Sequence, residues 1–190
     1  MIDLYTYINE GVLDDIEDTL KNSDNNIIAI IKEFINSNYK CTGLKISKRP
    51  NSDGKYVVDA KNSKVYVTNV NIVSLTNGLF VWGVVKSFYC YNCSSLTSLE
   101  GAPTECYEFS YYNCSSLTSL EGAPTKCNSF GCGQCNSLTS LKGAPKECNL
   151  FDCGNCSSLK SLNDAPAKCN FFYCNGCNSL ASLDGAPKKL

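Results

Sequence analysis

The sequence predicts an α/β repeat solenoid that has a single parallel sheet and a small α+β head in front of it. Three observations lead to this fold class. Residues 88–190 consist of five consecutive units in which one pattern recurs at every twenty-first position. Each unit contains a short stretch in which apolar and variable residues alternate, as in a strand with one buried face. Residues 1–66 lack this period and carry helical and strand patterns instead.

Two helices are expected at the start of the head. Apolar residues recur there at helical spacing on two separate faces. Residues 23–25, Ser-Asp-Asn, lie between the two faces and form an N-cap region for the second helix. The two faces consist of Leu13, Ile16 and Leu20, and of Ile27, Ile30, Ile31, Phe34 and Ile35.

Three short strands are expected to complete the head, at residues 44–47, 55–59 and 64–68. Residues 49–54 (RPNSDG) and 60–63 (AKNS) contain turn-forming residues and predict a turn between each pair of strands. The head as a whole is expected to cover the open N-terminal end of the solenoid, because exposed sheet edges must be protected. An independent docking or targeting module is the alternative.

Each repeat unit is expected to form one coil of a right-handed solenoid. A single coil cannot bury its own apolar face, so stacked coils supply the core. The strands would stack into a parallel sheet over residues 67–174, at roughly 4.8 Å per coil. Leu-x-x-Leu followed by Gly-Ala-Pro predicts a turn or a short 3₁₀ piece on the convex side, since Pro cannot continue a helix. The residues in phase are Phe88, Phe109, Phe130, Phe151 and Phe172, then Leu96, Leu117, Leu138, Leu159 and Leu180, and then Leu99, Leu120, Leu141, Leu162 and Leu183.

The period extends one coil upstream of Phe88. Counting back one full period from Phe88 and from three later repeat positions gives four apolar residues. Residues 67–87 are therefore expected to form a degenerate first coil ahead of the five regular coils of residues 88–190, because terminal coils of solenoids are atypical. The solenoid would then span residues 67–190. The four upstream residues are Val67, Ile72, Leu75 and Val85.

One position in the Gly-Ala-Pro turn predicts a positive backbone angle φ. Four of the five units place Gly there, and one places Asp. Gly adopts a left-handed conformation without strain, and Asp is among the few other residues that tolerate one. The position is held by Gly101, Gly122, Gly143, Asp164 and Gly185.

The repeat pattern resembles that of leucine-rich repeat proteins. Residues 106–120 read C-x-x-F-x-Y-x-x-C-x-x-L-x-x-L, which is similar to the consensus L-x-x-L-x-L-x-x-N/C-x-L. The P-x-x-C-x-x-F lead-in resembles the short repeats of bacterial type III effectors, and "CSSLTSLEGAP" resembles repeat proteins of tailed phages and gut bacteria. The likeness covers roughly residues 65–190, with Cys and Phe where Leu is usual, and with a spacing of two residues rather than one after the ninth position. It implies a leucine-rich-repeat-like scaffold that binds a protein, and it does not identify the target.

The 14 cysteines are first of all candidate metal ligands or redox groups, because residues 132–135 form a Cys-x-x-Cys pair. Zinc, however, needs about four ligands that converge on one point. The period instead places all but one of the cysteines in three ladders along the core, and Tyr111 takes one place in the first ladder. We therefore expect core cysteines with free thiols and no metal or cofactor, while metal binding and redox chemistry stay open. The ladders are Cys90, Cys132, Cys153 and Cys174; Cys93, Cys114, Cys135, Cys156 and Cys177; and Cys106, Cys127, Cys148 and Cys169.

Charge and composition argue against several classes of function. Residues 1–87 carry 10 basic and 10 acidic side chains, and residues 88–190 carry 7 and 8, so neither half has the basic excess that binding to nucleic acid or to an anionic membrane requires. The chain contains no histidine and no phosphate-binding Gly-rich motif, so no enzyme activity is expected. A signal-peptide pattern and a bilayer-length apolar run are both lacking, so a cytoplasmic protein is expected, in a host cytoplasm if it is phage-encoded.

The outward positions of the predicted strands form the candidate binding surface, on the concave face of the solenoid. The first two regular coils and the last present aromatic side chains there, whereas the middle coils present glycine. Tyrosine is enriched at protein-binding surfaces, because it offers a large amphipathic contact area at low entropy cost. Packing of aromatic residues across a sheet is the alternative explanation. The candidate residues are Tyr89, Tyr91, Tyr112, Asp152, Phe171 and Tyr173.

The sequence thus favours a non-catalytic protein–protein interaction scaffold whose partner protein it does not identify. A cysteine-rich metal-binding protein and a structural or virion component are the alternatives. The strand around Phe172 would leave an unpaired edge at the C-terminal end of the solenoid, which favours a homodimer through that edge strand. Lys188 and Lys189 would otherwise protect the edge by their charge.

Overall fold

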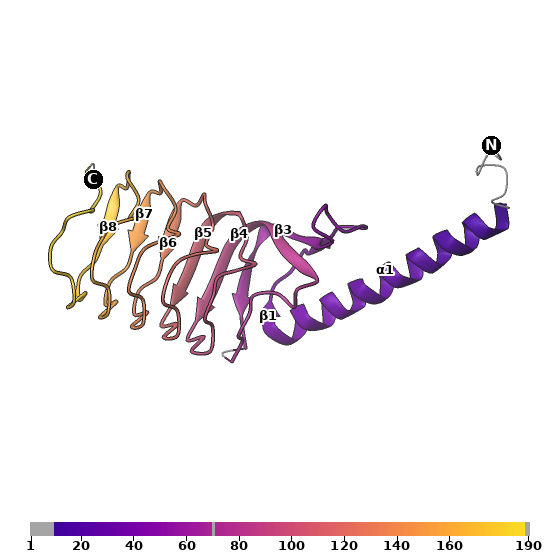
Figure 1. Cartoon of the computed structure of the whole chain (residues 1–190), viewed down its shortest axis with the longest axis horizontal. Helices are drawn as coiled ribbons and strands as arrows, with labels where there is room; N and C mark the ends of the chain where they lie inside the picture. The colour runs from indigo at the N-terminus through magenta and orange to yellow at the C-terminus, as the bar shows by residue number, and fades with distance from the viewer. Residues whose placement is uncertain (1–9, 70, 189–190) are drawn as a thin grey trace, which may run out of the picture.

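The computed structural model describes residues 10–69 and 71–188, with side chains from residue 22 onward. The chain forms a mostly parallel β-solenoid of about six turns, preceded by one long helix (Figure 1). The elements are α1 (Glu10–Asn38), β1 (Tyr39–Lys40), β2 (Lys45–Ile46), β3 (Tyr56–Val67), β4 (Phe80–Tyr91), β5 (Glu105–Tyr112), β6 (Ser129–Gly131), β7 (Leu150–Asp152) and β8 (Phe171–Tyr173). Within the described residues the strands form one sheet in the order β1-β3-β4-β5-β6-β7-β8, and β2 pairs with β3 at the side.

The prediction of two helices is wrong, because residues 10–38 form the single helix α1. Residues 23–25 lie within this helix and do not cap a second one. A tertiary contact uses the side chain of Asp24, whose carboxylate accepts a hydrogen bond from the hydroxyl of Tyr56. Asp and Asn cost roughly 0.7 kcal/mol or less in a helix interior. That contact, together with the complete burial of Ile35, outweighs the local preference for a cap.

The prediction of separate strands at residues 55–59 and 64–68 is also wrong, because both belong to the 12-residue strand β3. Residues 60–63 form no turn and continue the strand. Strand β3 pairs in parallel with β4, and the register shifts on both sides of Ala60 because the two strands contribute unequal numbers of residues there. The first predicted hairpin is confirmed, since β2 pairs antiparallel with β3 around the turn at residues 49–54.

The repeat units form one strand per coil, as predicted, and the period sets the register. From β4 to β8, residues that are one period apart lie side by side in parallel strands. The phenylalanine rings at one such position stack along the core, with centroids 5.2–5.7 Å apart in adjacent coils. The first coil differs, because Val65 and not Val67 lies beside Phe88. Val67 pairs instead with Tyr39 of β1.

A cluster of aromatic side chains joins the end of α1 to the first coil. Phe34 of the helix contacts Phe80 edge to face, with ring centroids 6.0 Å apart. Tyr39 contacts Trp82 at 5.2 Å, and Trp82 contacts Phe88 of the first regular strand at 5.5 Å. The core of the solenoid is therefore continuous with the packing of the helix.

The predicted positive φ in the Gly-Ala-Pro turn is confirmed in every coil, including Asp164 with φ of 67°. A second position with positive φ, which was not predicted from the sequence, follows each of the strands β4 to β8. It lies immediately after the outward residue that ends the strand pattern, and it carries mainly Asn, the non-glycine residue that most readily adopts this conformation. The position is held by Asn92, Asn113, Gln134, Asn155 and Gly176.

All the cysteines are free thiols, and most of those in the repeats are fully buried. The second ladder connects adjacent coils, because each of four thiols lies 3.0–3.7 Å from a backbone carbonyl oxygen in the preceding coil. Cys156, for example, donates to the carbonyl of Cys132 at 3.1 Å. These contacts give the buried thiols a structural role, as weak donors as well as small apolar groups.

Removal of the hydroxyl of Tyr111 is expected to stabilise the fold. Tyr111 is fully buried, and its hydroxyl is the one buried side-chain N or O atom of the described residues without a hydrogen-bond partner. A buried donor without a partner costs about 1–3 kcal/mol. Tyr111→Phe should therefore raise the free energy of unfolding by about 1 kcal/mol in urea titrations.

Tyr39→Phe is the matched control for this substitution. The hydroxyl of Tyr39 is buried too, but it donates to the carbonyl of Leu75 at 2.7 Å. Its removal should lower the free energy of unfolding by about 1 kcal/mol. A Tyr111→Phe variant no more stable than the wild type would contradict the expectation.

Gly143→Ala is expected to destabilise the solenoid more than Gly54→Ala. Both residues have positive φ, which costs a non-glycine residue roughly 1–2 kcal/mol. A Cβ atom at Gly143 would also lie 2.3 Å from the carbonyl oxygen of Leu120 in the preceding coil, whereas one at Gly54 would meet no atom within 4 Å. The clash should add about 1–3 kcal/mol, measured by urea denaturation followed by circular dichroism. Equal losses in the two variants would show that the coils can move apart there at little cost.

Candidate functional site

The outer face of the sheet carries the predicted binding residues on four strands. Tyr89 and Tyr91 belong to β4, and Tyr112 ends β5. Asp152 ends β7, while Phe171 and Tyr173 lie on β8. Their side chains point away from the core because they alternate with the buried residues of each strand.

Tyr89 lies on this face, but it is only 6% exposed. Its ring stacks on that of Tyr66 from β3, with centroids 4.8 Å apart, and the Lys64 ammonium lies 5.9 Å from its centroid. Its hydroxyl donates a hydrogen bond to the Glu108 carboxylate on β5. Tyr89 therefore fixes its neighbours in place and offers little surface of its own.

Tyr66 and Lys64 were missed by the sequence analysis. Tyr66 pairs with Tyr89 across β3 and β4, although the two lie further apart in the sequence than one period. Counting back one full period from Tyr89 gives Thr68 instead. The aromatic composition of residues 64–68 was the one signal available for Tyr66, since the regular period does not reach it.

Tyr91 and Tyr112 form the exposed part of the surface. They lie opposite each other in neighbouring strands, and they are 43% and 39% exposed. The ring of Tyr112 lies over Gly133 of the next coil, where an added Cβ would come within 2.9 Å of the ring. We call Tyr66, Tyr89, Tyr91 and Tyr112 together the N-terminal aromatic patch.

The remaining predicted residues form a separate C-terminal patch. Phe171 is 52% exposed and Tyr173 46%, and Asp152 pairs with Tyr173 across β7 and β8. The carboxylate of Asp152 accepts a hydrogen bond of 2.8 Å from the backbone N–H of Gly154, which fixes its orientation. Strand β6 separates the two patches, so the six predicted residues do not form one cluster.

The environment raises the pKa of two tyrosines of the N-terminal patch, Tyr89 and Tyr91. Burial, and then the hydrogen bond to Glu108, raises the pKa of Tyr89 to about 12. Burial also raises the pKa of Tyr91. Their hydroxyl groups therefore act as uncharged hydrogen-bond donors, as in many protein-binding surfaces.

Burial also keeps two thiols of the third ladder, Cys106 and Cys127, neutral. Burial raises the pKa of Cys106 and of Cys127 to about 12. A thiol must lose its proton to act as a nucleophile or to bind a metal. In the part of the chain that the structure describes, no three Cys, Asp or Glu side chains converge as a metal site.

Comparisons of the chain with protein-family models, with curated proteins and with solved structures found no match. The likeness to leucine-rich repeat proteins therefore rests on sequence motifs alone. Over residues 10–69 and 71–188, the structure contains no helix with enough apolar length to cross a membrane.

The fold is expected to lose stability as the pH rises above about 9. Cys106 and Cys127 have folded pKa values of about 12, against an ordinary value of 9.0. The folded state therefore binds more protons than the unfolded state in this range. The stabilisation that the two neutral thiols contribute is fully present below pH 9, and the free energy of unfolding falls as the pH rises above it. Urea titrations from pH 7 to pH 11 would measure this slope.

Cys127→Ala is the control for this pH dependence. It removes one group with a raised pKa, so its free energy of unfolding should fall less steeply with pH than that of the wild type. A free energy of unfolding that stays constant from pH 8 to pH 11 would contradict the assignment of buried, neutral thiols.

Proposed function

We propose that the protein is a non-catalytic scaffold, built like a leucine-rich repeat protein, that binds a partner protein on the outer face of its sheet. The observation that carries this proposal is the pair of exposed tyrosines, Tyr91 and Tyr112, side by side on a rigid sheet. Buried aromatic anchors supply much of the binding energy in protein interfaces. A tyrosine pair exposed in the free protein is suited to become such an anchor.

The packing around the pair supports a preformed binding surface. Tyr91 rests beside Tyr89, with ring centroids 5.8 Å apart, and Tyr89 is itself fixed by Tyr66 and Glu108. Tyr112 occupies the space that Gly133 leaves open. Binding would therefore restrict little additional side-chain motion, which lowers its entropy cost.

The same proposal assigns the helix and β1–β3 to a cap at the N-terminal end of the solenoid. Ile31 and Ile35 of α1 are completely buried, and Phe34 and Tyr39 contact the aromatic side chains of the first coil. The absence of histidine from the chain favours a non-catalytic role, because histidine is the commonest general acid or base. A cytoplasmic setting agrees with the many reduced cysteines.

Photo-crosslinking in cells of the protein's natural host tests this proposal. A benzophenone amino acid replaces Tyr112 in one variant and Val73 in a control variant, since Val73 is exposed on the first coil and lies outside the patch. We expect a partner protein to crosslink at position 112 and not at position 73. Tyr91→Ala in the first variant should reduce the crosslink about tenfold or more, as loss of an anchor residue does.

The controls separate loss of binding from loss of folding. Tyr91 is 43% exposed, so Tyr91→Ala should keep the circular dichroism spectrum of the wild type. Equal crosslinking at positions 112 and 73, or no effect of Tyr91→Ala, would overturn the assignment of the aromatic face as the binding site.

A further inference from the structure

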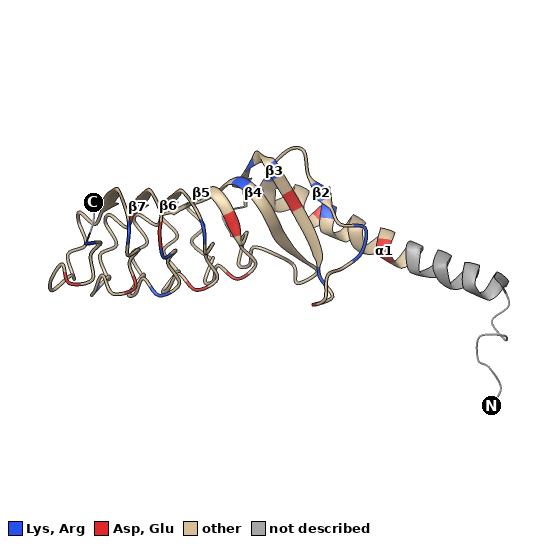
Figure 2. Ribbon diagram, turned by 90° about the horizontal axis from the view of Figure 1, so that it is seen from above, with Lys and Arg blue, Asp and Glu red and all other residues tan. Residues whose placement is uncertain are grey.

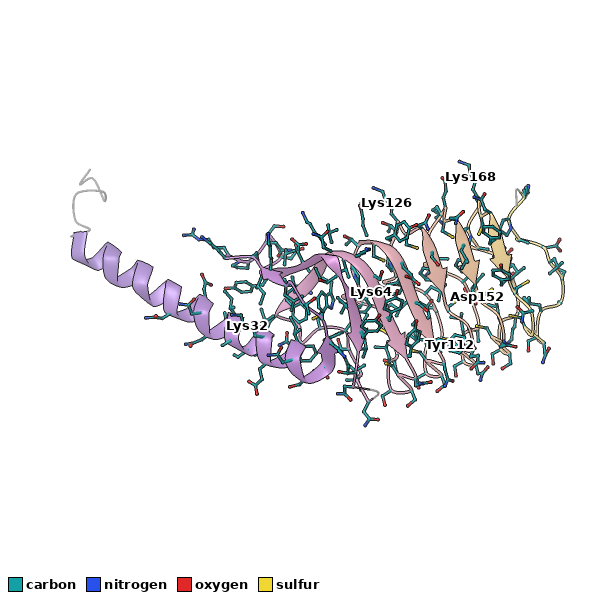
Figure 3. The ribbon with its side chains drawn as sticks, turned by 180° about the vertical axis from the view of Figure 1, so that it is seen from behind. Lys32, Lys64, Tyr112, Lys126, Asp152 and Lys168 are labelled. Atoms are coloured by element: carbon teal, nitrogen blue, oxygen red, sulfur yellow. The ribbon has the colours of Figure 1, made fainter. Side chains whose placement is uncertain are left out.

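A groove crosses the sheet at the opposite ends of the strands from Tyr112. It runs over the middle of β4, the start of β5 and the residues that precede β6 and β7, with a cavity volume of about 820 Å³. A second hollow of about 440 Å³ shares Cys127, Asn128 and Glu147 with the first, so the two are continuous. We call this feature the lead-in groove. Figure 3 shows Lys126 and Lys168 projecting from the side of the solenoid where the groove lies, and Tyr112 near the opposite side.

The floor of the lead-in groove is apolar. Val85, Cys106 and Cys127 occupy one position in three successive coils, and each is at least nine-tenths buried. Two large apolar side chains stand exposed beside them, Val84 at 44% and Tyr107 at 63%. Exposed apolar groups around a hollow are typical of a surface that another molecule covers.

The charges around the groove favour an acidic occupant. Four lysines and two glutamates line the larger hollow. The two glutamates are neutralised along the coils, because Glu105 pairs with Lys126 at 2.9 Å and Glu147 with Lys168 at 2.7 Å. Within the described residues, the other three lysines make no ion pair, so the groove is locally positive although the whole chain has a net charge of −1. These three are Lys61, Lys86 and Lys146.

The length of the groove fits a short extended segment. Five coils contribute one residue each to one edge of the groove, from Val84 to Lys168, and four of these residues are charged. At roughly 4.8 Å per coil the edge is about 19 Å long, and an extended chain covers that length with about six residues at roughly 3.3 Å each. Alternate side chains of such a segment would point to the apolar floor and to the lysines.

We propose that the lead-in groove binds an extended segment of a partner protein in which acidic and large apolar residues alternate. This surface is distinct from the aromatic patches, and its assignment does not depend on them. Nucleic acid fits the groove less well, because the apolar floor and Tyr107 would stay uncovered beneath a phosphate backbone.

Fluorescence anisotropy with a labelled six-residue peptide of alternating Asp and Leu tests the proposal. We expect saturable binding to the wild type that weakens as salt is added. Lys86→Glu together with Lys146→Glu should weaken it about tenfold or more, and Tyr107→Ser should weaken it too. Lys160→Glu is the matched control, because Lys160 is exposed on a coil turn outside the groove and should leave binding unchanged.

Further binding measurements identify the surface and the kind of peptide that it binds. Tyr91→Ala combined with Tyr112→Ala should leave the peptide affinity unchanged, so failure of the aromatic site and failure of the groove are distinguishable. Equal affinity for a peptide of alternating Lys and Leu, or for a short single-stranded oligothymidine, would overturn the proposal. So would the absence of saturable binding, or the same loss of affinity in Lys160→Glu as in the groove variants.

Discussion

The requirement that each coil lie directly on the one before it governs this structure. Parallel hydrogen bonding between strands puts every side chain beside the residue one period away. The most regular positions therefore carry side chains that tolerate a copy of themselves, or that meet an opposite partner. Phenylalanine satisfies the rule by stacking, cysteine by burying neutral thiols such as those of Cys106 and Cys127, and asparagine by pairing amide with amide, as between Asn149 and Asn170. The position of Glu105, Lys126, Glu147 and Lys168 satisfies it by alternating sign, which is visible along the coils (Figure 2).

The same register determines what the surface can present. Small residues in one coil leave room for large residues of the coil before, as Gly133 does for Tyr112. The two surfaces proposed for binding are thus composed across coils. The N-terminal patch takes residues from β3, β4 and β5, and the lead-in groove takes residues from several coils in turn. A substitution in one coil therefore alters the environment of its neighbour.

The regular part of the fold could be predicted from the sequence because one period repeats without interruption. The strand positions, the parallel pairing and the left-handed turn at Asp164 all follow from that period. The head could not be predicted as well, because its geometry depends on contacts between distant segments. The Tyr56–Asp24 hydrogen bond keeps α1 continuous through a cap-like sequence. The bulges near Ala60 shift the register of the first coil away from the regular period.

The candidate site was predictable in its residues but not in their exposure. The alternation of each strand identifies Tyr89 and Tyr91 as outward, yet Tyr89 is covered because the shifted first coil brings Tyr66 onto it. The lead-in groove has a different origin. Apart from Lys61, its residues lie in four adjacent repeat positions, and sequence alternation assigns them to opposite faces of the sheet, without indicating that they border one hollow.

The alternating Glu–Lys edge bears on how such a chain can change length during evolution. Tandem repeats are gained and lost as whole units when neighbouring copies recombine. Loss of the coil that contains Lys126 would bring Glu105 beside Glu147, and like charges directly opposite each other across strands are destabilising. Loss of two coils would keep the signs alternating. Along this edge, the charge alternation is therefore preserved when internal coils are gained or lost in pairs.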